Sequence, residues 1–441
     1  MPVTRRLLAP LAAAAAIAAV LPASAAPPNF VVAWAGSAQG PYPVGYATAQ
    51  PDLRFAFPDP AQGASNQSFR LIVRPDIWGK QARIRLSNVF GTKTVTFDSV
   101  HIGLQQSGSA ILAGTNVPVT FGARTTIAIP PGKFATSDPA ILPFVHEPPD
   151  KLLTGRRLAV SFHVVGDSGP MNWHAKGLTT SYISPPGSGA HASEESEKSY
   201  PYSTTSWYFL DALDMSAPAG TPAIVAFGDS ITDGTASTIN GDDRWPDVLA
   251  RHMHDLYGAK FSVVNAGIGG NMIIGPADYK SNLFAGGPSA LDRLERDVIR
   301  LSGVKTIIWL EGINDFGNAG ADPDKVEDGV KEAVKRLRTA LPGARIVMAT
   351  LTSSLNSTNG GYGTPAVDAK RKAFNTFVRT CGLFDGVIDF DAVTVDPNTG
   401  ELRADYQPNS STGGPGDKLH PNRAGYQAMG LSIDPKVILG Q

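Results

Sequence analysis

The chain has 441 residues, of which 42 % are hydrophobic and 17 % are charged, and its formal net charge is −1. This length and composition exclude a disordered chain and predict two or three folded domains. The near-neutral charge and the lack of a Lys/Arg cluster argue against nucleic-acid binding, and the single cysteine, Cys381, excludes an intrachain disulfide and a cysteine-based metal site.

Residues 1–25 have the pattern of a signal peptide. Two arginines precede an apolar run over residues 7–21, and a small-residue cleavage signal ends at Ala25. A membrane anchor is the alternative, but the run is short for a span and Pro10 interrupts it. We therefore expect cleavage after Ala25 and a secreted or periplasmic protein, without stable insertion in a membrane.

Residues 27–218 are predicted to form an all-β domain. Short alternating segments separated by Gly and Pro are typical of an antiparallel sandwich, here jelly-roll-like. Strands are expected over residues 29–34, 68–74, 82–87, 95–102, 125–129, 157–164 and 206–210, followed by a linker over 215–222. This domain could bind carbohydrate through Trp34, Trp78, Trp173 or Trp207, although burial in the core fits most of these side chains better.

From residue 221 the pattern changes to alternating strands and helices. Strands are expected over 223–227, 261–265, 306–311, 345–351 and 387–390, and helices over 244–257, 290–301, 324–341, 366–380 and 423–431. This alternation predicts an α/β domain over residues 221–441, with a parallel sheet between layers of helices.

The segment 223–234 holds the first candidate for chemistry. Gly228 and Asp229 end a buried strand directly before Ser230. Open α/β sheets keep their active sites at the carboxyl ends of their strands, which is where this turn places the serine hydroxyl. Ser230 is therefore the candidate nucleophile, and a serine that starts a turn or caps a helix is the alternative.

A serine nucleophile needs a general base, which we expect to be a histidine held by a carboxylate. His420 lies just before the last predicted helix and follows Asp417 by three residues, so one turn can bring the two side chains together. A capping aspartate beside a surface histidine is the alternative. His252 and His254 lie on a predicted helix, two residues apart, and make a poor pair of metal ligands.

Two further strand ends offer donors for an oxyanion. The strand 261–265 continues into a glycine-rich turn, where a backbone N–H can approach a ligand closely. The strand 306–311 is followed by Gly312 and Asn314, and the asparagine amide is a neutral donor. The glycine-rich turn lacks a phosphate-loop pattern, so nucleotide binding is a weak alternative.

Four blocks, in this order, resemble the GDSL, or SGNH, hydrolase family. They are Gly228-Asp-Ser-Ile231, Asn265-Ala-Gly-Ile-Gly-Gly270, Gly312-Ile-Asn-Asp315 and Asp417-Lys-Leu-His420. The sequence around the serine lacks the Gly-x-Ser-x-Gly elbow, since position 232 is Thr, which argues against the α/β-hydrolase class.

The resemblance implies a flavodoxin-like three-layer α/β/α domain and a triad of Ser230, His420 and Asp417. It also implies an oxyanion hole made by the Ser230 N–H, the Gly270 N–H and the Asn314 amide, with Gly269 as the alternative to Gly270. No metal and no cofactor are expected, because the histidines are scattered and no His-Glu-x-x-His pattern occurs.

These features predict a serine esterase that acts through an acyl-enzyme. We expect an acetylated polysaccharide as its substrate, because of the export pattern, the β-rich companion domain and a looser resemblance to acetyl-xylan-esterase-type proteins. A lipase or lysophospholipase-like esterase is the alternative, although few apolar residues flank the four blocks. A third hypothesis, an inert hydrolase domain beside a binding module, fits poorly with four intact blocks.

Overall fold

The computed structural model describes residues 1–2, 29–149, 151–279 and 281–440. The predicted signal peptide and its cleavage after Ala25 therefore lie outside the described residues. Within the described ranges, no helix combines the length and the hydrophobicity that crossing a membrane requires.

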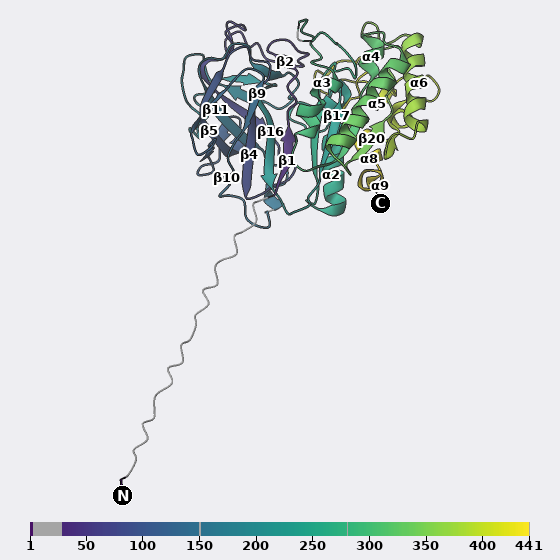
Figure 1. Cartoon of the computed structure of the whole chain (residues 1–441). Helices are drawn as coiled ribbons and strands as arrows, with labels where there is room; N and C mark the ends of the chain where they lie inside the picture. The colour runs from purple at the N-terminus through teal and green to yellow at the C-terminus, as the bar shows by residue number, and fades with distance from the viewer. Residues whose placement is uncertain (3–28, 150, 280, 441) are drawn as a thin grey trace.

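The N-terminal part is built of antiparallel strands (Figure 1). Within the described residues, one sheet has the order β1-β16-β4-β10 with β9 on β4, a second has the order β14-β13-β3-β11-β5-β6 with β7 and β8 on β5, and a third has the order β15-β12-β2. Their bounds are β1 Phe30–Ala35, β2 Gly40–Pro41, β3 Ser65–Val73, β4 Gln81–Asn88, β5 Val95–Ser107, β6 Ala110–Ile111, β7 Val117–Pro118, β8 Thr126–Ile129, β9 Lys133–Thr136, β10 Ala140–Ile141, β11 Leu158–Asp167, β12 Asn172–His174, β13 Ser181–Ile183, β14 Tyr202–Thr204, β15 Trp207–Tyr208 and β16 Leu210–Ser216. The predicted β-rich character is confirmed, and the jelly-roll-like arrangement stays a prediction.

The end of this part differs from the sequence-based expectation. The predicted last strand, 206–210, is only the short β15, and the chain continues as β16 between β1 and β4. Two aspartates obscure this strand in the sequence, but both are paired: Asp211 lies 2.5 Å from Arg85 and Asp214 lies 2.6 Å from Arg83. Buried charges with partners are compatible with a central strand.

The C-terminal part is a parallel α/β sheet with the strand order β18-β17-β19-β20-β21. Numbered along the chain, this order is 2-1-3-4-5, the doubly wound order of flavodoxin-like folds. The strands are β17 Ala223–Gly228, β18 Ser262–Gly267, β19 Val304–Leu310, β20 Arg345–Ala349 and β21 Gly386–Ile388. The predicted α/β class is confirmed for this half of the chain.

Two groups of helices flank the sheet: α2 packs against α8, and α5 packs against α3 and α6 (Figure 1). The helices are α1 Ser230–Asp233, α2 Trp245–Tyr257, α3 Ala290–Leu294, α4 Ile313–Gly317, α5 Pro323–Ala340, α6 Pro365–Thr380, α7 Phe390–Thr394, α8 Arg423–Ser432 and α9 Pro435–Leu439, and a π-helical turn over Glu295–Ile299 continues α3. The long helices match the predicted ones because their starts carry clear signals, such as Pro323 at the start of α5 and the Thr364 cap of α6.

The two parts share one hydrophobic core, which includes residues from both β1 and β18. Hydrogen bonds join the parts as well: the Val32 N–H donates to the Ser302 carbonyl at 3.0 Å, and the Ser262 hydroxyl donates to the Val32 carbonyl at 2.6 Å. The domain limits 27–218 and 221–441 therefore stay predictions.

The tryptophans considered as carbohydrate platforms are largely core residues. Trp34, Trp173 and Trp207 are buried, and the rings of Trp34 and Trp207 meet edge to face with centroids 4.8 Å apart. Trp78 is half-buried against Phe144. Buried rings of this kind stabilise the core and cannot stack on a sugar.

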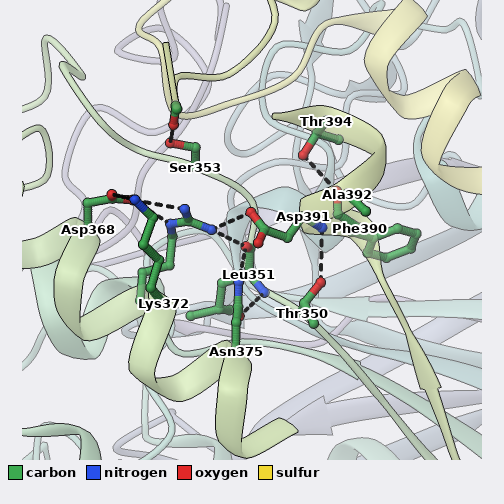
Figure 2. A network of polar contacts seen from close by, with 12 residues as sticks. Thr350, Leu351, Ser353, Asp368, Lys372, Asn375, Phe390, Asp391, Ala392 and Thr394 are labelled. Atoms are coloured by element: carbon green, nitrogen blue, oxygen red, sulfur yellow. Dashed lines mark hydrogen bonds and ion pairs between the residues drawn. The ribbon is translucent and has the colours of Figure 1, made fainter. Parts of the chain in front are cut away.

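A polar network ties α6 to the end of β20 (Figure 2). The buried Arg371 donates to Asp368 at 2.9 Å, to the Leu351 carbonyl at 2.9 Å and to Asp391 at 2.5 Å. Asn375 accepts from the Leu351 N–H at 2.7 Å and donates to its carbonyl at 2.9 Å. The network fixes the point at which the chain leaves the sheet for the loop between β20 and α6.

Candidate active site

The turn after β17 positions Ser230 at the first residue of α1. Asp229 caps this helix, with its Oδ1 atom accepting from the Ile231 N–H at 2.9 Å. A Cβ atom on Gly228 would lie 2.2 Å from the Leu310 carbonyl oxygen of the neighbouring strand. The sharp departure from the sheet thus needs glycine at 228, and it leaves Ser230 4 % exposed at the carboxyl edge.

The structure brings Ser230, His420 and Asp417 into one chain of hydrogen bonds. The His420 Nε2 atom lies 2.8 Å from the Ser230 Oγ atom, and its Nδ1 atom lies 2.6 Å from Asp417 Oδ2. A carboxylate accepts hydrogen bonds, so Nδ1 carries the proton and Nε2 is free to accept from the serine hydroxyl.

A tight turn over residues 417–420 makes this arrangement possible. Asp417 Oδ1 accepts from the N–H groups of Leu419 and His420 at 3.0 and 2.9 Å, and Lys418 has the left-handed φ of 58°. Burial alone would raise the pKa of the Asp417 carboxyl, but the charge and hydrogen bond of His420, together with these backbone N–H groups, hold its pKa well below its usual value. The Asp417 carboxyl therefore carries its charge beside His420 near neutral pH.

Gly270 and Asn314 line the same pocket as Ser230. The Gly269 N–H is engaged, since it donates to Asp233 Oδ2 at 2.9 Å. By contrast, the Gly270 N–H has no acceptor within the part of the chain that the structure describes. This geometry favours Gly270 over Gly269 as a donor to an oxyanion.

Three buried aspartates near the site hold backbone groups. Asp229 caps α1, Asp233 accepts from Gly269, and Asp315 accepts from the N–H groups of Ile273 and Ile274 at 2.9 and 3.1 Å. Burial raises the pKa of Asp229, which Glu311 raises further, and burial raises the pKa of Asp315 to about 6. These contacts shape the strand ends that present Ser230 and Asn314.

The pocket around Ser230 has a volume of about 400 Å³. Its described lining residues are Tyr46, Lys176, Ser230, Gly270, Asn314, Asn318, Asn359, Gly360, Tyr362, Asp417, Leu419 and His420. Hydrogen-bonding groups dominate this lining, and Leu419 is its one aliphatic side chain among the described residues.

The β-rich part contributes Tyr46 and Lys176 to the pocket wall, which sequence reasoning did not find. The Lys176 ammonium donates to Thr235 Oγ1 at 2.7 Å. Burial lowers the pKa of Lys176, and the charges of Asp233, Asp417 and Asp229 oppose this effect. No local motif marks either residue, because both reach the site only through the packing of the two parts.

Between the two parts, His174 lies beside one of the buried aspartates. Its Nε2 atom is 3.2 Å from Asp233 Oδ1 without the geometry of a hydrogen bond, and its Nδ1 atom donates to the Ser37 carbonyl at 2.7 Å. The described residues hold no group of three or more His, Cys, Asp or Glu side chains that could bind a metal ion.

Comparison with protein families assigns the α/β part to a class. Residues 226–428 match the model of the GDSL-like Lipase/Acylhydrolase family. The protein is therefore a carboxylic ester hydrolase, and this segment is a GDSL-like acylhydrolase domain. The match spans the segment that holds Ser230, Asn314 and His420, and it confirms the resemblance stated from the sequence.

Solved structures that resemble this chain cover about half of it. One is a carbohydrate acetylesterase family member from Sinorhizobium meliloti, with 18 % identity and a TM-score of 0.38 over 50 % of this chain and 100 % of that chain. Another is an aryl esterase from M. smegmatis, with 18 % identity and a TM-score of 0.36 over 49 % and 98 %. A third is an acetyl xylan esterase, with 17 % identity and a TM-score of 0.34 over 48 % and 96 %. No curated protein matches the sequence.

Proposed function

We propose that the protein is a secreted serine esterase that removes acetyl groups from a polysaccharide. The observation that carries the proposal is the pair of contacts from Ser230 Oγ to His420 Nε2 at 2.8 Å and from His420 Nδ1 to Asp417 at 2.6 Å, at the edge of an open pocket. The pattern of residues 1–25 supports secretion.

In the proposed reaction, His420 takes the Ser230 proton while Ser230 Oγ attacks the ester carbonyl carbon. The carbonyl oxygen becomes an oxyanion, which the N–H groups of Ser230 and Gly270 and the Asn314 amide stabilise. The C–O bond to the alcohol then breaks, and the alcohol leaves with the proton from His420. Water, deprotonated by His420, attacks the acetyl-serine and releases acetate, and the proton returns to Ser230.

The lining of the pocket supports a small acyl group on a polar alcohol. The pocket offers polar groups that suit sugar hydroxyls: the amides of Asn318 and Asn359 and the hydroxyl of Tyr46. The ring face of Tyr46 suits a sugar ring. A long acyl chain would need an extended apolar wall, and Leu419 alone is a short one. The lipase alternative has no such supporting observation among the described residues.

Acetate release from acetylated xylan, pectin and chitin-type polymers tests the proposal, beside hydrolysis of aryl esters from acetyl to palmitoyl. We expect acetate from a polymer, short-chain preference among the aryl esters, and a loss of at least about 10⁵-fold in kcat for Ser230→Ala. Ser432→Ala, an exposed position outside the pocket, is the matched control. Turnover of long-chain esters alone would favour the lipase alternative, and activity that survives Ser230→Ala would overturn the nucleophile.

A further inference from the structure

The loop between β20 and α6 reaches both ends of the site. The Tyr362 hydroxyl donates to Asn314 Oδ1 at 2.8 Å, and the Asn359 amide donates to Asp417 Oδ2 at 2.9 Å. One short segment, absent from the four sequence blocks, therefore contacts both the proposed oxyanion donor and the proposed partner of His420.

The Asn314 amide is held at both of its ends. Its Nδ2 atom donates to the Asn271 carbonyl at 2.8 Å, and its Oδ1 atom accepts from Tyr362. The carbonyl of Asn271 can only accept, which fixes the nitrogen on that side and the oxygen toward Tyr362. One N–H of the amide is then used by Asn271, and the second is left for the pocket that Asn314 lines.

The orientation of this amide decides its chemical effect. An N–H that faces the reacting carbonyl stabilises the oxyanion of the transition state, whereas a flipped amide would present its oxygen and repel it. Asn271 constrains one end of the amide, and the Tyr362 hydroxyl is the group that gives the oxygen a partner in the productive orientation.

Tyr362 is itself fixed in place. A Cβ atom on Gly317 would lie 2.2 Å from the Tyr362 ring, so the ring packs directly on the backbone of α4. The loop is also bound to the turn that holds Asp417: the Ser357 hydroxyl and the Thr358 N–H donate to the Asp417 carbonyl at 2.7 and 3.0 Å. Burial raises the pKa of Tyr362, which keeps its hydroxyl protonated as a donor.

We propose that Tyr362 is a positioning residue for ester hydrolysis, whose hydroxyl holds the Asn314 amide with an N–H toward the oxyanion. The proposal rests on the proposed function and adds to it a residue that no sequence block contains. Because Tyr362 acts through Asn314, its effect belongs to the transition state and not to substrate binding.

Tyr362→Phe removes this one hydroxyl and keeps the ring on Gly317. With 4-nitrophenyl acetate we expect kcat to fall about tenfold with KM within about twofold, less than the loss of about 10²–10³ expected for Asn314→Ala. Tyr279→Phe is the matched control, since the Tyr279 hydroxyl donates to the Gln39 carbonyl at 2.7 Å outside the pocket. This control also removes one hydrogen bond. It should lower the thermal unfolding temperature by a comparable amount and leave kcat unchanged.

A double-mutant cycle separates positioning from direct contact with the substrate. In the Asn314→Ala background, Tyr362→Phe should change kcat by less than about twofold, because no amide remains to be oriented. An equal fall in both backgrounds, a rise in KM without a change in kcat, or unchanged kinetics of Tyr362→Phe would each overturn the proposal. An inactive wild type, or an active Ser230→Ala, would instead contradict the proposed function itself.

Discussion

At the scale of single residues, buried carboxyl groups of the α/β part differ in their charge state. Asp417 is held ionised by His420 and by backbone N–H groups, whereas Glu311, one residue beyond β19, is pushed toward its neutral form. Burial raises the pKa of Glu311 to about 7. The Arg293 guanidinium, 3.9 Å from Glu311 Oε1, and the Trp309 indole N–H, which donates to Oε2 at 2.7 Å, oppose this rise. Burial dominates at Glu311 because its charged partner is too distant for a hydrogen bond.

The Glu311 carboxyl should make stability depend on pH. Its pKa in the folded protein, about 7, lies above its unfolded value near 4.5, so its stabilising contribution is complete below about pH 4.5 and is lost as the pH rises through about 7. We expect the free energy of unfolding of the wild type, relative to Glu311→Gln, to fall by about 3 kcal/mol between about pH 4 and about pH 8. Urea unfolding over this range measures it.

Glu332→Gln, at an exposed position of α5, is the control and should leave the pH dependence unchanged. A difference between wild type and Glu311→Gln that stays constant with pH would show that the pKa of Glu311 is the same in the folded and the unfolded protein. The charge of Arg293 and the hydrogen bond from Trp309 would then fully offset the effect of burial on this carboxyl.

At the scale of elements, the close contact of β18 with α1 fixes the position of Ser230, the proposed nucleophile. A Cβ atom on Gly267, the last residue of β18, would lie 2.3 Å from the Asp233 backbone nitrogen. Gly267→Ala should therefore displace α1, lowering the free energy of unfolding by about 1–3 kcal/mol and reducing kcat. Urea unfolding and 4-nitrophenyl acetate kinetics test both effects.

Gly414→Ala is the matched control, because a Cβ atom there would meet only Thr412 Oγ1, at 3.6 Å. It should leave kcat unchanged and shift stability by less than about 1 kcal/mol. If Gly267→Ala left kcat as unchanged as Gly414→Ala does, β18 would accommodate the added Cβ atom without displacing Ser230.

Helices and strands could be predicted from the sequence where a clear periodic pattern runs through many consecutive residues. The strands around Ser230 and the helices α2, α5, α6 and α8 have clear periods and caps, so their positions follow within a few residues. The helices α1 and α4 have only four and five residues, too few to show a helical period. β16 was missed because its aspartates are paired with arginines from a strand more than 120 residues away.

The same distinction holds for the site. Three of the four blocks lie at strand ends and the fourth lies just before α8, and together they predict that Ser230, Gly270, Asn314 and His420 meet at one site. Tyr46, Lys176 and Tyr362 lie outside such blocks, and only tertiary packing brings them to the pocket.

At the scale of the whole molecule, the two parts are joined by buried contacts as well as by a chain connection. Asp76, in the loop after β3, accepts from the Val263 N–H of β18 at 2.6 Å and lies 3.0 Å from His254 of α2. Arg296 donates to the Ala38 carbonyl at 2.7 Å, so the β-rich part also binds the turn that follows α3. Interfaces between independent domains are usually more exposed and more polar than this shared core.

The protein should accordingly unfold in one cooperative transition. A shared core means that loss of either part exposes apolar surface of the other, which couples their stabilities. We expect a single calorimetric peak with equal calorimetric and van't Hoff enthalpies, and loss of esterase activity at the same temperature. Two resolved peaks, with activity following only one of them, would show that the parts fold independently.

Tyr46 and Lys176 form part of the pocket wall, and they come from a different part of the polypeptide than Ser230 and His420. The groups proposed to transfer protons lie after residue 228, whereas Tyr46 and Lys176 of the pocket wall lie before residue 177. Under the proposed function, we expect substitutions in the loops that carry Tyr46 and Lys176 to change which ester is hydrolysed while the Ser230–His420 contact stays as it is. For directed evolution, a library confined to these two loops would explore substrate scope with Ser230 and His420 held constant.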